Sequence, residues 1–205
     1  MKGFTLALDL AERFLVLCLY GALAGRIIGA VSSEGMGLGN LLLLPSEGLV
    51  LAFVLVRRGT EDVSMHPPDW VLAVAASSAP MLVAAAPVHP LISPIAGGVV
   101  LVMGTLVQVH AKVVLGRSFG CVPANRGLKD KGPYRFVRHP MYAGYMVSHF
   151  AFALMNPSAW NVAMYVICTL LQVPRLLAEE RLLDRDERYR RYRALVRYRV
   201  VPGIF

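Results

Sequence analysis

The chain has 205 residues, of which 56% are hydrophobic and only 17% charged, and its formal net charge is +8. Soluble domains usually carry about 25% charged residues, whereas uncharged stretches of about 20 residues are typical of membrane-spanning helices. The composition therefore excludes an ordinary soluble domain. Lys and Arg collect on the cytoplasmic side of membrane proteins, where they set the orientation of the chain in the bilayer. This explains the excess of basic residues, and no nucleic-acid partner is expected.

The apolar stretches predict an all-α, polytopic integral membrane protein with about six transmembrane helices. In chain order, the predicted spans are Leu10–Val31, Leu41–Val56, Trp70–Val88, Ile95–Leu115 and two within Tyr142–Val173. The last stretch is too long for one crossing and is interrupted by Asn156-Pro157. It is therefore predicted to fold as a helical hairpin.

Beyond the hairpin, residues 174–199 are polar and rich in arginine. Their apolar side chains recur at spacings that share one helical face. This pattern predicts a C-terminal amphipathic helix on the cytosolic side, in contact with anionic lipid headgroups.

The distribution of Lys and Arg predicts the orientation of the chain. Residues 57–69, the loop 116–141 and the C-terminal tail hold nearly all of the cations, and the connections on the other side hold none. By the positive-inside rule, both termini are expected in the cytosol and the protein in the cytoplasmic (inner) membrane.

Two further groups of residues have a structural and a functional interpretation. Arg26 and Glu47 fall inside predicted spans, where a structural ion pair and a functional relay both remain open. Cys18, Cys121 and Cys168 match no zinc-binding spacing and are expected to be free thiols, so no metal site is predicted.

Two places combine charged groups with aromatic rings at the cytosolic ends of the predicted hairpin. One is the stretch Gly132–Gly144, which contains an Arg-His-Pro sequence, and the other is Arg175 with Glu179 and Glu180. Arg175 and Glu179 are one helical turn apart and can pair. Since a hairpin brings its ends together, these groups are predicted to surround one pocket. On residue types alone, a functional site and simple anchoring to headgroups are equally open.

The sequence Gly-Pro-Tyr-Arg-Phe-Val-Arg-His-Pro-Met-Tyr-Ala-Gly at residues 132–144 resembles the signature of the isoprenylcysteine carboxyl methyltransferase family and its phospholipid methyltransferase relatives. Leu115–Gly120 is similar to the segment that precedes that signature. The family's C-terminal pattern is similar to Glu179-Glu180 with Leu183, followed by Tyr189, Tyr192 and Pro202-Gly203. The resemblance covers roughly the C-terminal half. It implies a membrane methyltransferase that binds S-adenosylmethionine from the cytosol, with S-adenosylhomocysteine as product. The implied acceptor is lipid-like and enters from the bilayer, and O-methylation of an isoprenylcysteine-type carboxylate is the favoured reaction.

The resemblance also assigns roles to residues. Those implied to bind the cofactor are Tyr134, Arg138, His139, Pro140, Tyr142, Gly144, Glu179 and Glu180. The implied catalytic residues are Arg175, Glu180 and Arg138, with Arg175 holding the acceptor carboxylate as a bidentate partner. A carboxylate is ionised at neutral pH, so it needs positioning and no general base. In this scheme residues 112–205 are the catalytic half of one integrated membrane domain, and residues 1–111 are N-terminal transmembrane helices.

Several alternatives stay open. A phospholipid or amine N-methyltransferase is the nearest one, and its neutral nitrogen would need a base such as His139. A small transporter would use Arg26 and Glu47, although no inverted repeat supports it. A lipid-binding scaffold would tolerate alanine at Arg138, His139 and Glu180. The tail at Arg185–Tyr189 also departs from the family's usual sequence, which leaves its packing open. The oligomeric state is not predicted.

Overall fold

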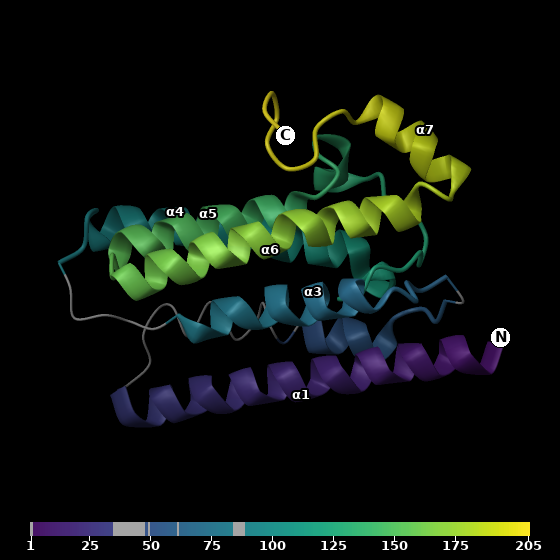
Figure 1. Cartoon of the computed structure of the whole chain (residues 1–205). Helices are drawn as coiled ribbons and strands as arrows, with labels where there is room; N and C mark the ends of the chain where they lie inside the picture. Colours follow the sequence, from purple (N-terminus) through teal and green to yellow (C-terminus); the bar gives the residue numbers. More distant parts are fainter. Residues whose placement is uncertain (1, 35–47, 49, 61, 84–88) are drawn as a thin grey trace.

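The described part of the chain is helical. A computed structural model describes every residue except 1, 35–47, 49, 61 and 84–88 (Figure 1). Its α-helices are α1 (Lys2–Glu34), α3 (Pro67–Ser78), α4 (Pro94–Leu115), α5 (Pro140–Met155), α6 (Ala159–Leu183) and α7 (Glu187–Leu195), and residues 50–56 are also helical. Short 3-10 turns are η1 (Ala79–Leu82), η2 (Gly116–Ser118) and η3 (Gly132–Arg135). Within the described ranges, β-structure is limited to an isolated bridge between Val63 and Ala124, which confirms the all-α prediction.

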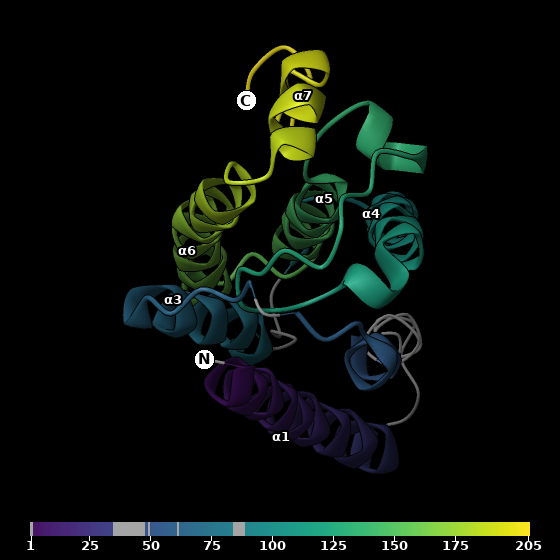
Figure 2. The same cartoon turned by 90° about the vertical axis from the view of Figure 1, so that its right-hand side faces the viewer.

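The long helices run side by side in layers. α4, α5 and α6 form one group, α3 lies against it, and α1 lies on the far side of α3, as Figures 1 and 2 both show. The N-terminus, the loop that follows α4, the C-terminal end of α6 and α7 all lie at the same end of the bundle. The places predicted to share one end of the hairpin therefore do so.

Local sequence signals set where the helices begin. The Ser93 side chain accepts a hydrogen bond from Ala96 N and caps α4, and Ser158 does the same for α6 through Asn161 N. α5 begins with Pro140, whose fixed φ suits the first helical position. The predicted break after α5 is confirmed, because α5 ends before Asn156 and α6 starts at Ala159.

α4 and α5 pack closely because glycines face each other where they cross. A Cβ on Gly144 would lie 2.7 Å from Gln108 Cγ and 2.8 Å from Gln108 N, and a Cβ on Gly104 would lie 2.8 Å from Ser148 N. At the same place Gln108 Nε2 donates to Ser148 Oγ at 2.8 Å. Small residues that allow close backbone approach, with a polar bond across the contact, are typical of helices packed in membranes.

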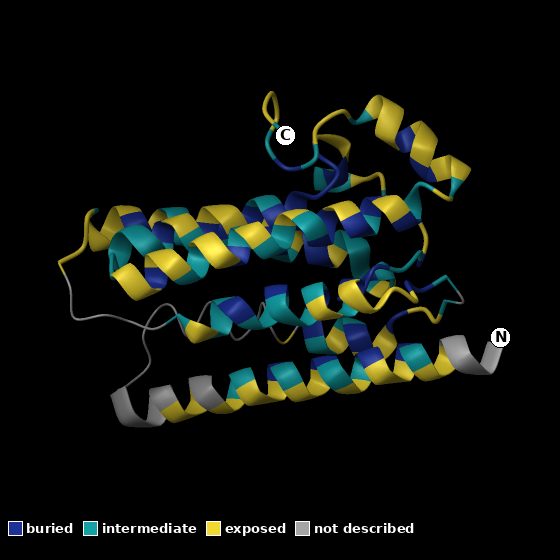
Figure 3. Cartoon of the chain, viewed as in Figure 1, coloured by how far each residue is buried: buried dark blue, intermediate teal, exposed yellow. Residues whose placement is uncertain are grey.

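The outer faces of the bundle are apolar. Figure 3 shows exposed positions along the outward faces of α1 and α4–α6. The large apolar side chains exposed there include Leu10, Phe14, Met103, Leu106, Phe150 and Leu170. In the described ranges, two helices are long and apolar enough to cross a membrane, Pro94–Ser118 and Ala159–Leu183. An apolar surface of this extent is the one a lipid-facing protein requires.

The helix bounds correct several expectations. α1 begins at Lys2, well before Leu10, and α3 with η1 ends at Leu82, too short for the span predicted up to Val88, of which residues 84–88 lie outside the description. The predicted span 41–56 is described as a helix only over residues 48 and 50–56. The count of six crossings stays a prediction. The Arg26–Glu47 pair also falls outside the described side chains.

The amphipathic helix predicted over residues 174–199 does not begin where it was expected to. α6 continues through Pro174 to Leu183, and only Glu187–Leu195 forms the separate helix α7. A proline costs one backbone hydrogen bond, but a helix held on several sides tolerates it. The continuation places Arg175, Glu179 and Glu180 on α6, at the end of the hairpin.

We expect Gly144→Ala to destabilise the protein by about 1–3 kcal/mol, because the added methyl group overlaps Gln108. Thermal or denaturant unfolding in detergent measures the change. The matched control is Gly25→Ala on α1, where no heavy atom lies within 4 Å of the new Cβ. Equal stability of the two variants would contradict this account of the α4–α5 contact.

Candidate active site

A buried carboxylate, Glu180, joins three other side chains at one end of the hairpin. Its Oε1 accepts hydrogen bonds from Arg138 Nε at 2.7 Å and lies 3.2 Å from His139 Nε2. Its Oε2 accepts from Arg199 Nε at 2.9 Å. The Glu180 side chain is only 4% exposed, so the two arginines supply the countercharge that burial requires. The cluster links the start of α5, the end of α6 and the C-terminal tail.

Backbone bonds fix the tail against the start of α5. Arg138 N donates to Tyr198 O at 2.9 Å, and His139 N donates to Arg199 O at 2.7 Å. The Arg138 guanidinium also donates from Nη1 to the carbonyls of Val196 and Arg197, both at 3.0 Å. Since its side chain already has these partners, Arg138 holds the tail in place.

A cavity lies between this cluster, α7 and the basic loop. Of the residues that line it, those predicted for the cofactor are Tyr134, Arg138, His139, Tyr142 and Glu179, and the tyrosines of α7, Tyr189 and Tyr192, form another wall. Tyr142 Oη donates to Glu179 Oε2 at 3.4 Å, and Tyr192 Oη donates to Tyr134 O at 2.7 Å. We call this space the α7 cavity. It offers a carboxylate, aromatic rings and phenolic hydroxyls to one ligand.

The Tyr189 hydroxyl is the unusual group in the α7 cavity. The residue is 3% exposed, and its Oη has no hydrogen-bond partner in the described part of the chain. Burial, followed by the nearby charges of Glu180 and Glu179, raises the pKa of Tyr189 above its ordinary value, so the hydroxyl keeps its proton. A buried hydroxyl without a partner costs free energy, and a bound ligand with an acceptor atom would remove that cost.

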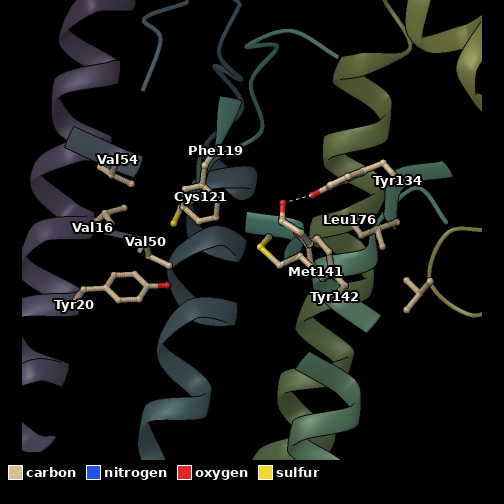
Figure 4. Close-up of a cluster of buried hydrophobic side chains, with 12 residues drawn as sticks. Val16, Tyr20, Val50, Val54, Phe119, Cys121, Tyr134, Met141, Tyr142 and Leu176 are labelled. Carbon is tan, nitrogen blue, oxygen red and sulfur yellow. Dashed lines mark hydrogen bonds between the residues drawn. The ribbon is translucent and has the colours of Figure 1, made fainter. Parts of the chain in front are cut away.

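A second, larger cavity of about 210 Å³ contains Arg175. We call it the Arg175 cavity. It is mostly apolar, with Tyr20, Phe119 and Cys121 on one side and Met141 on the other, as Figure 4 shows. Arg175 is 7% exposed. It donates to Cys121 O at 2.9 Å and makes long contacts with Ser77 Oγ at 3.4 Å and Gln172 Oε1 at 3.5 Å.

The pair that helical spacing allows between Arg175 and Glu179 does not form. No carboxylate pairs with Arg175 anywhere in the described chain, because the side chain turns towards α3 and the basic loop. Glu179 faces the α7 cavity instead. Tyr142 lies between the two, with its ring centroid 5.9 Å from Arg175 Cζ and its hydroxyl on Glu179. Met141 lines both cavities, so the two cavities are neighbours.

A buried ionic cluster fixes the loop that Arg175 contacts. Arg57 Nη2 lies 2.8 Å from Asp9 Oδ1, and Arg126 Nη2 lies 2.8 Å from Glu12 Oε2. Glu12, which is fully buried, also accepts from the backbone of Cys121 at 2.7 Å. α1 therefore holds the Cys121 peptide, whose carbonyl in turn holds Arg175.

The structure separates the predicted site residues into four groups. Tyr134, Arg138, His139, Tyr142 and Glu179 line the α7 cavity, and Arg175 lines the other one. Glu180 does not line the α7 cavity, but it contacts Arg138 and His139, which do. Pro140 and Gly144 line neither cavity: Pro140 starts α5, and Gly144 packs against α4.

Several residues of the site were not found from the sequence. Arg199 and Tyr189 lie in the tail whose packing was left open, and Glu12 and Arg126 pair across more than 100 positions. Of these, only Tyr189 carried a signal, as part of the tyrosine spacing in the C-terminal pattern.

Comparisons with known proteins find one matching family model and a solved structure of similar fold. Residues 92–189 match the sequence model of a family described as phospholipid methyltransferase. No curated protein sequence matches the chain. The fold is similar to that of the eukaryotic intramembrane Ras methyltransferase, isoprenylcysteine carboxyl methyltransferase, with a TM-score of 0.53 and 18% sequence identity. That match covers 98% of this chain and 74% of the solved one.

Glu180→Gln is expected to lower the stability by about 3 kcal/mol, because it leaves the buried Arg138 without its countercharge. Unfolding in detergent measures the loss. The matched control is Glu187→Gln on α7, whose pair with Arg191 is exposed and contributes at most about 1 kcal/mol. If both variants change stability equally, Glu180 does not hold the site together.

Proposed function

We propose, from the match of residues 92–189 to the phospholipid methyltransferase family model, that the protein transfers a methyl group from S-adenosylmethionine to the carboxylate of a lipid-like acceptor. An isoprenylcysteine-type carboxylate is the acceptor we favour. The methyl donor would occupy the α7 cavity, and the acceptor would enter the Arg175 cavity from the bilayer. The α7 cavity would then lie at the cytosolic face of the membrane, where the exposed arginines of α7 contact anionic headgroups.

The observation that carries this proposal is the state of Arg175. It is a buried cation in a largely apolar cavity and has no carboxylate partner in the residues described. A buried charge is costly unless it is paired, so this site favours an occupant that brings an anion. An amphiphile with an apolar tail and a carboxylate head meets both requirements. Arginine binds a carboxylate through two parallel hydrogen bonds, which also fixes its orientation.

The residues of the α7 cavity fit S-adenosylmethionine. Glu179 offers oxygens for its ammonium group, and the rings of Tyr134 and Tyr142 offer faces for its adenine or sulfonium. The partnerless Tyr189 hydroxyl offers a donor for an acceptor atom. When bound, S-adenosylmethionine supplies an electrophilic methyl group. Arg138, His139 and Glu180 are assigned to holding the cavity wall, since their side chains are already bonded to one another and to the tail.

The protein's part in the transfer is positioning. A carboxylate oxygen forms the new bond to the methyl carbon as the carbon–sulfur bond breaks, and the products are a methyl ester and S-adenosylhomocysteine. No proton moves, because the carboxylate is already ionised. Arg175 orients the carboxylate, and the Tyr142 ring lies between Arg175 and the α7 cavity. Holding two reactants in line is worth several orders of magnitude in rate.

Methylation of a phospholipid amine is the second candidate, and the description of the matched family favours it. An amine acceptor is neutral or cationic, so the buried charge of Arg175 would stay unpaired or repel it. It would also need a base to accept a proton. His139 is the histidine that lines the α7 cavity, and its Nε2 is next to Glu180.

Tyr189→Phe is expected to weaken S-adenosylmethionine binding about fivefold to tenfold and to leave stability unchanged, because its hydroxyl has no protein partner to lose. Calorimetry and unfolding in detergent measure the two effects. The control is Tyr192→Phe, which removes the bond to Tyr134 O and should cost stability. Unchanged affinity in Tyr189→Phe would remove its hydroxyl from the cofactor site.

Arg175→Ala is expected to lower kcat/KM for N-acetyl-S-farnesylcysteine by about 100-fold or more, while S-adenosylmethionine affinity changes less than about twofold. The value of kcat/KM falls because the acceptor carboxylate loses Arg175 as its cationic partner. Methyl transfer in nanodiscs and calorimetry are the measurements. Arg188→Ala on the exposed face of α7 is the control. Equal loss of turnover and of cofactor affinity would contradict the role assigned to Arg175.

A further inference from the structure

The Arg175 cavity contains a polar aromatic group that carboxylate binding does not use. His149, on α5, is stacked between Tyr145 and Tyr165, with ring centroids 6.0 Å and 4.6 Å away. Tyr165 comes from α6, so the stack joins both helices of the hairpin. All three rings line the cavity.

Two members of this group lack a hydrogen-bond partner. In the described ranges, neither the ring nitrogens of His149 nor the hydroxyl of Tyr165 makes a hydrogen bond, and both residues contact their neighbours through their rings. Other polar side chains of the cavity have partners: Gln108 Nε2 donates to Ser148 Oγ at 2.8 Å, and Gln172 Nε2 to Ala76 O at 3.4 Å. A polar group away from water costs free energy unless it is bonded, and ionisable residues inside membrane helices are usually functional.

The helix geometry places this group away from the carboxylate end. Tyr165 precedes Arg175 by ten residues on α6, which is about 15 Å along the axis at 1.5 Å per residue. The apolar side chains of Leu101 and Phe152 line the cavity as well. An occupant with its carboxylate on Arg175 therefore passes His149 and Tyr165 with its tail.

We propose that the acceptor tail carries a hydrogen-bonding oxygen, as a hydroxyl or carbonyl group, which His149 and Tyr165 bind. This inference rests on the proposed function for the placement of the carboxylate. A plain hydrocarbon tail leaves the imidazole and the phenol without partners, whereas an oxygen at that depth bonds to them. A site built to hydrogen-bond a group discriminates against analogues that lack it. His149 and Tyr165 are therefore specificity-determining residues, and the preferred acceptor is an oxygenated carboxylic amphiphile.

The test uses synthetic 3-(alkylthio)propionates of one chain length. One is unsubstituted, and the others carry a single carbonyl at stepped positions along the chain. Binding to the full-length protein in nanodiscs is measured without the methyl donor, and methyl transfer is measured separately. One or two adjacent carbonyl positions are expected to bind about tenfold more tightly than the unsubstituted chain. Tyr165→Phe, which removes one oxygen, and His149→Phe should each abolish that preference, with S-adenosylmethionine affinity as the check on folding.

The control variant is Phe152→Leu, which alters the same cavity and should keep the preference. Equal binding of all the propionates to the wild type would overturn the inference, as would a preference that survives both Tyr165→Phe and His149→Phe. Selective binding without methyl transfer would support the polar site and count against the proposed function. Methyl transfer without selectivity would support the proposed function and overturn the polar site.

Discussion

The site depends on the ion pairs that the buried Glu180 carboxylate makes with two arginines. This carboxylate gathers Arg138, His139 and Arg199 from three segments that are far apart in the sequence. Because Arg138 and Arg199 both pair with Glu180, moving the tail away from the hairpin would leave a buried charge exposed or without its partner. The tail and α7 are thereby held over the end of the hairpin, and α7 supplies the tyrosines that close the cavity.

Two cavities of different character lie next to each other, with Met141 in the lining of both. The α7 cavity is rich in polar groups and lies among α7, the basic loop and the C-terminal end of α6, and the Arg175 cavity is largely apolar and lies between the long helices. A water-soluble donor and a lipid acceptor have opposite solvation needs, so separate cavities that share one wall suit a reaction between them. Glu12 on α1 extends the arrangement across the bundle, since it fixes the Cys121 peptide that Arg175 binds. The N-terminal helix therefore contributes to a site whose recognisable motifs all lie in the other half.

Much of this arrangement was predictable from the sequence. Helix α4 and the break at Asn156-Pro157 followed from apolar length and Asn-Pro chemistry, and the hairpin then placed Arg138 near Glu180. The partner of Arg175 was not predictable, because helical spacing allowed Glu179 whereas tertiary contacts turned the side chain to Cys121. The end of α6 was also missed, since Pro174 usually ends a helix but here lies within one. Ion pairs such as Arg126–Glu12 join residues more than 100 positions apart, for which spacing carries no signal.

The most direct test of the account is the chemical form of the transferred methyl group. The purified protein in nanodiscs would receive S-adenosylmethionine labelled in its methyl group, together with N-acetyl-S-farnesylcysteine and, in parallel, phosphatidylethanolamine. The account predicts label in the farnesylated acid that alkali releases as methanol, as a methyl ester does, and none in the amine. Alkali-stable label in phosphatidylethanolamine, with none in the acid, would contradict carboxylate methylation and leave Arg175 without its assigned role.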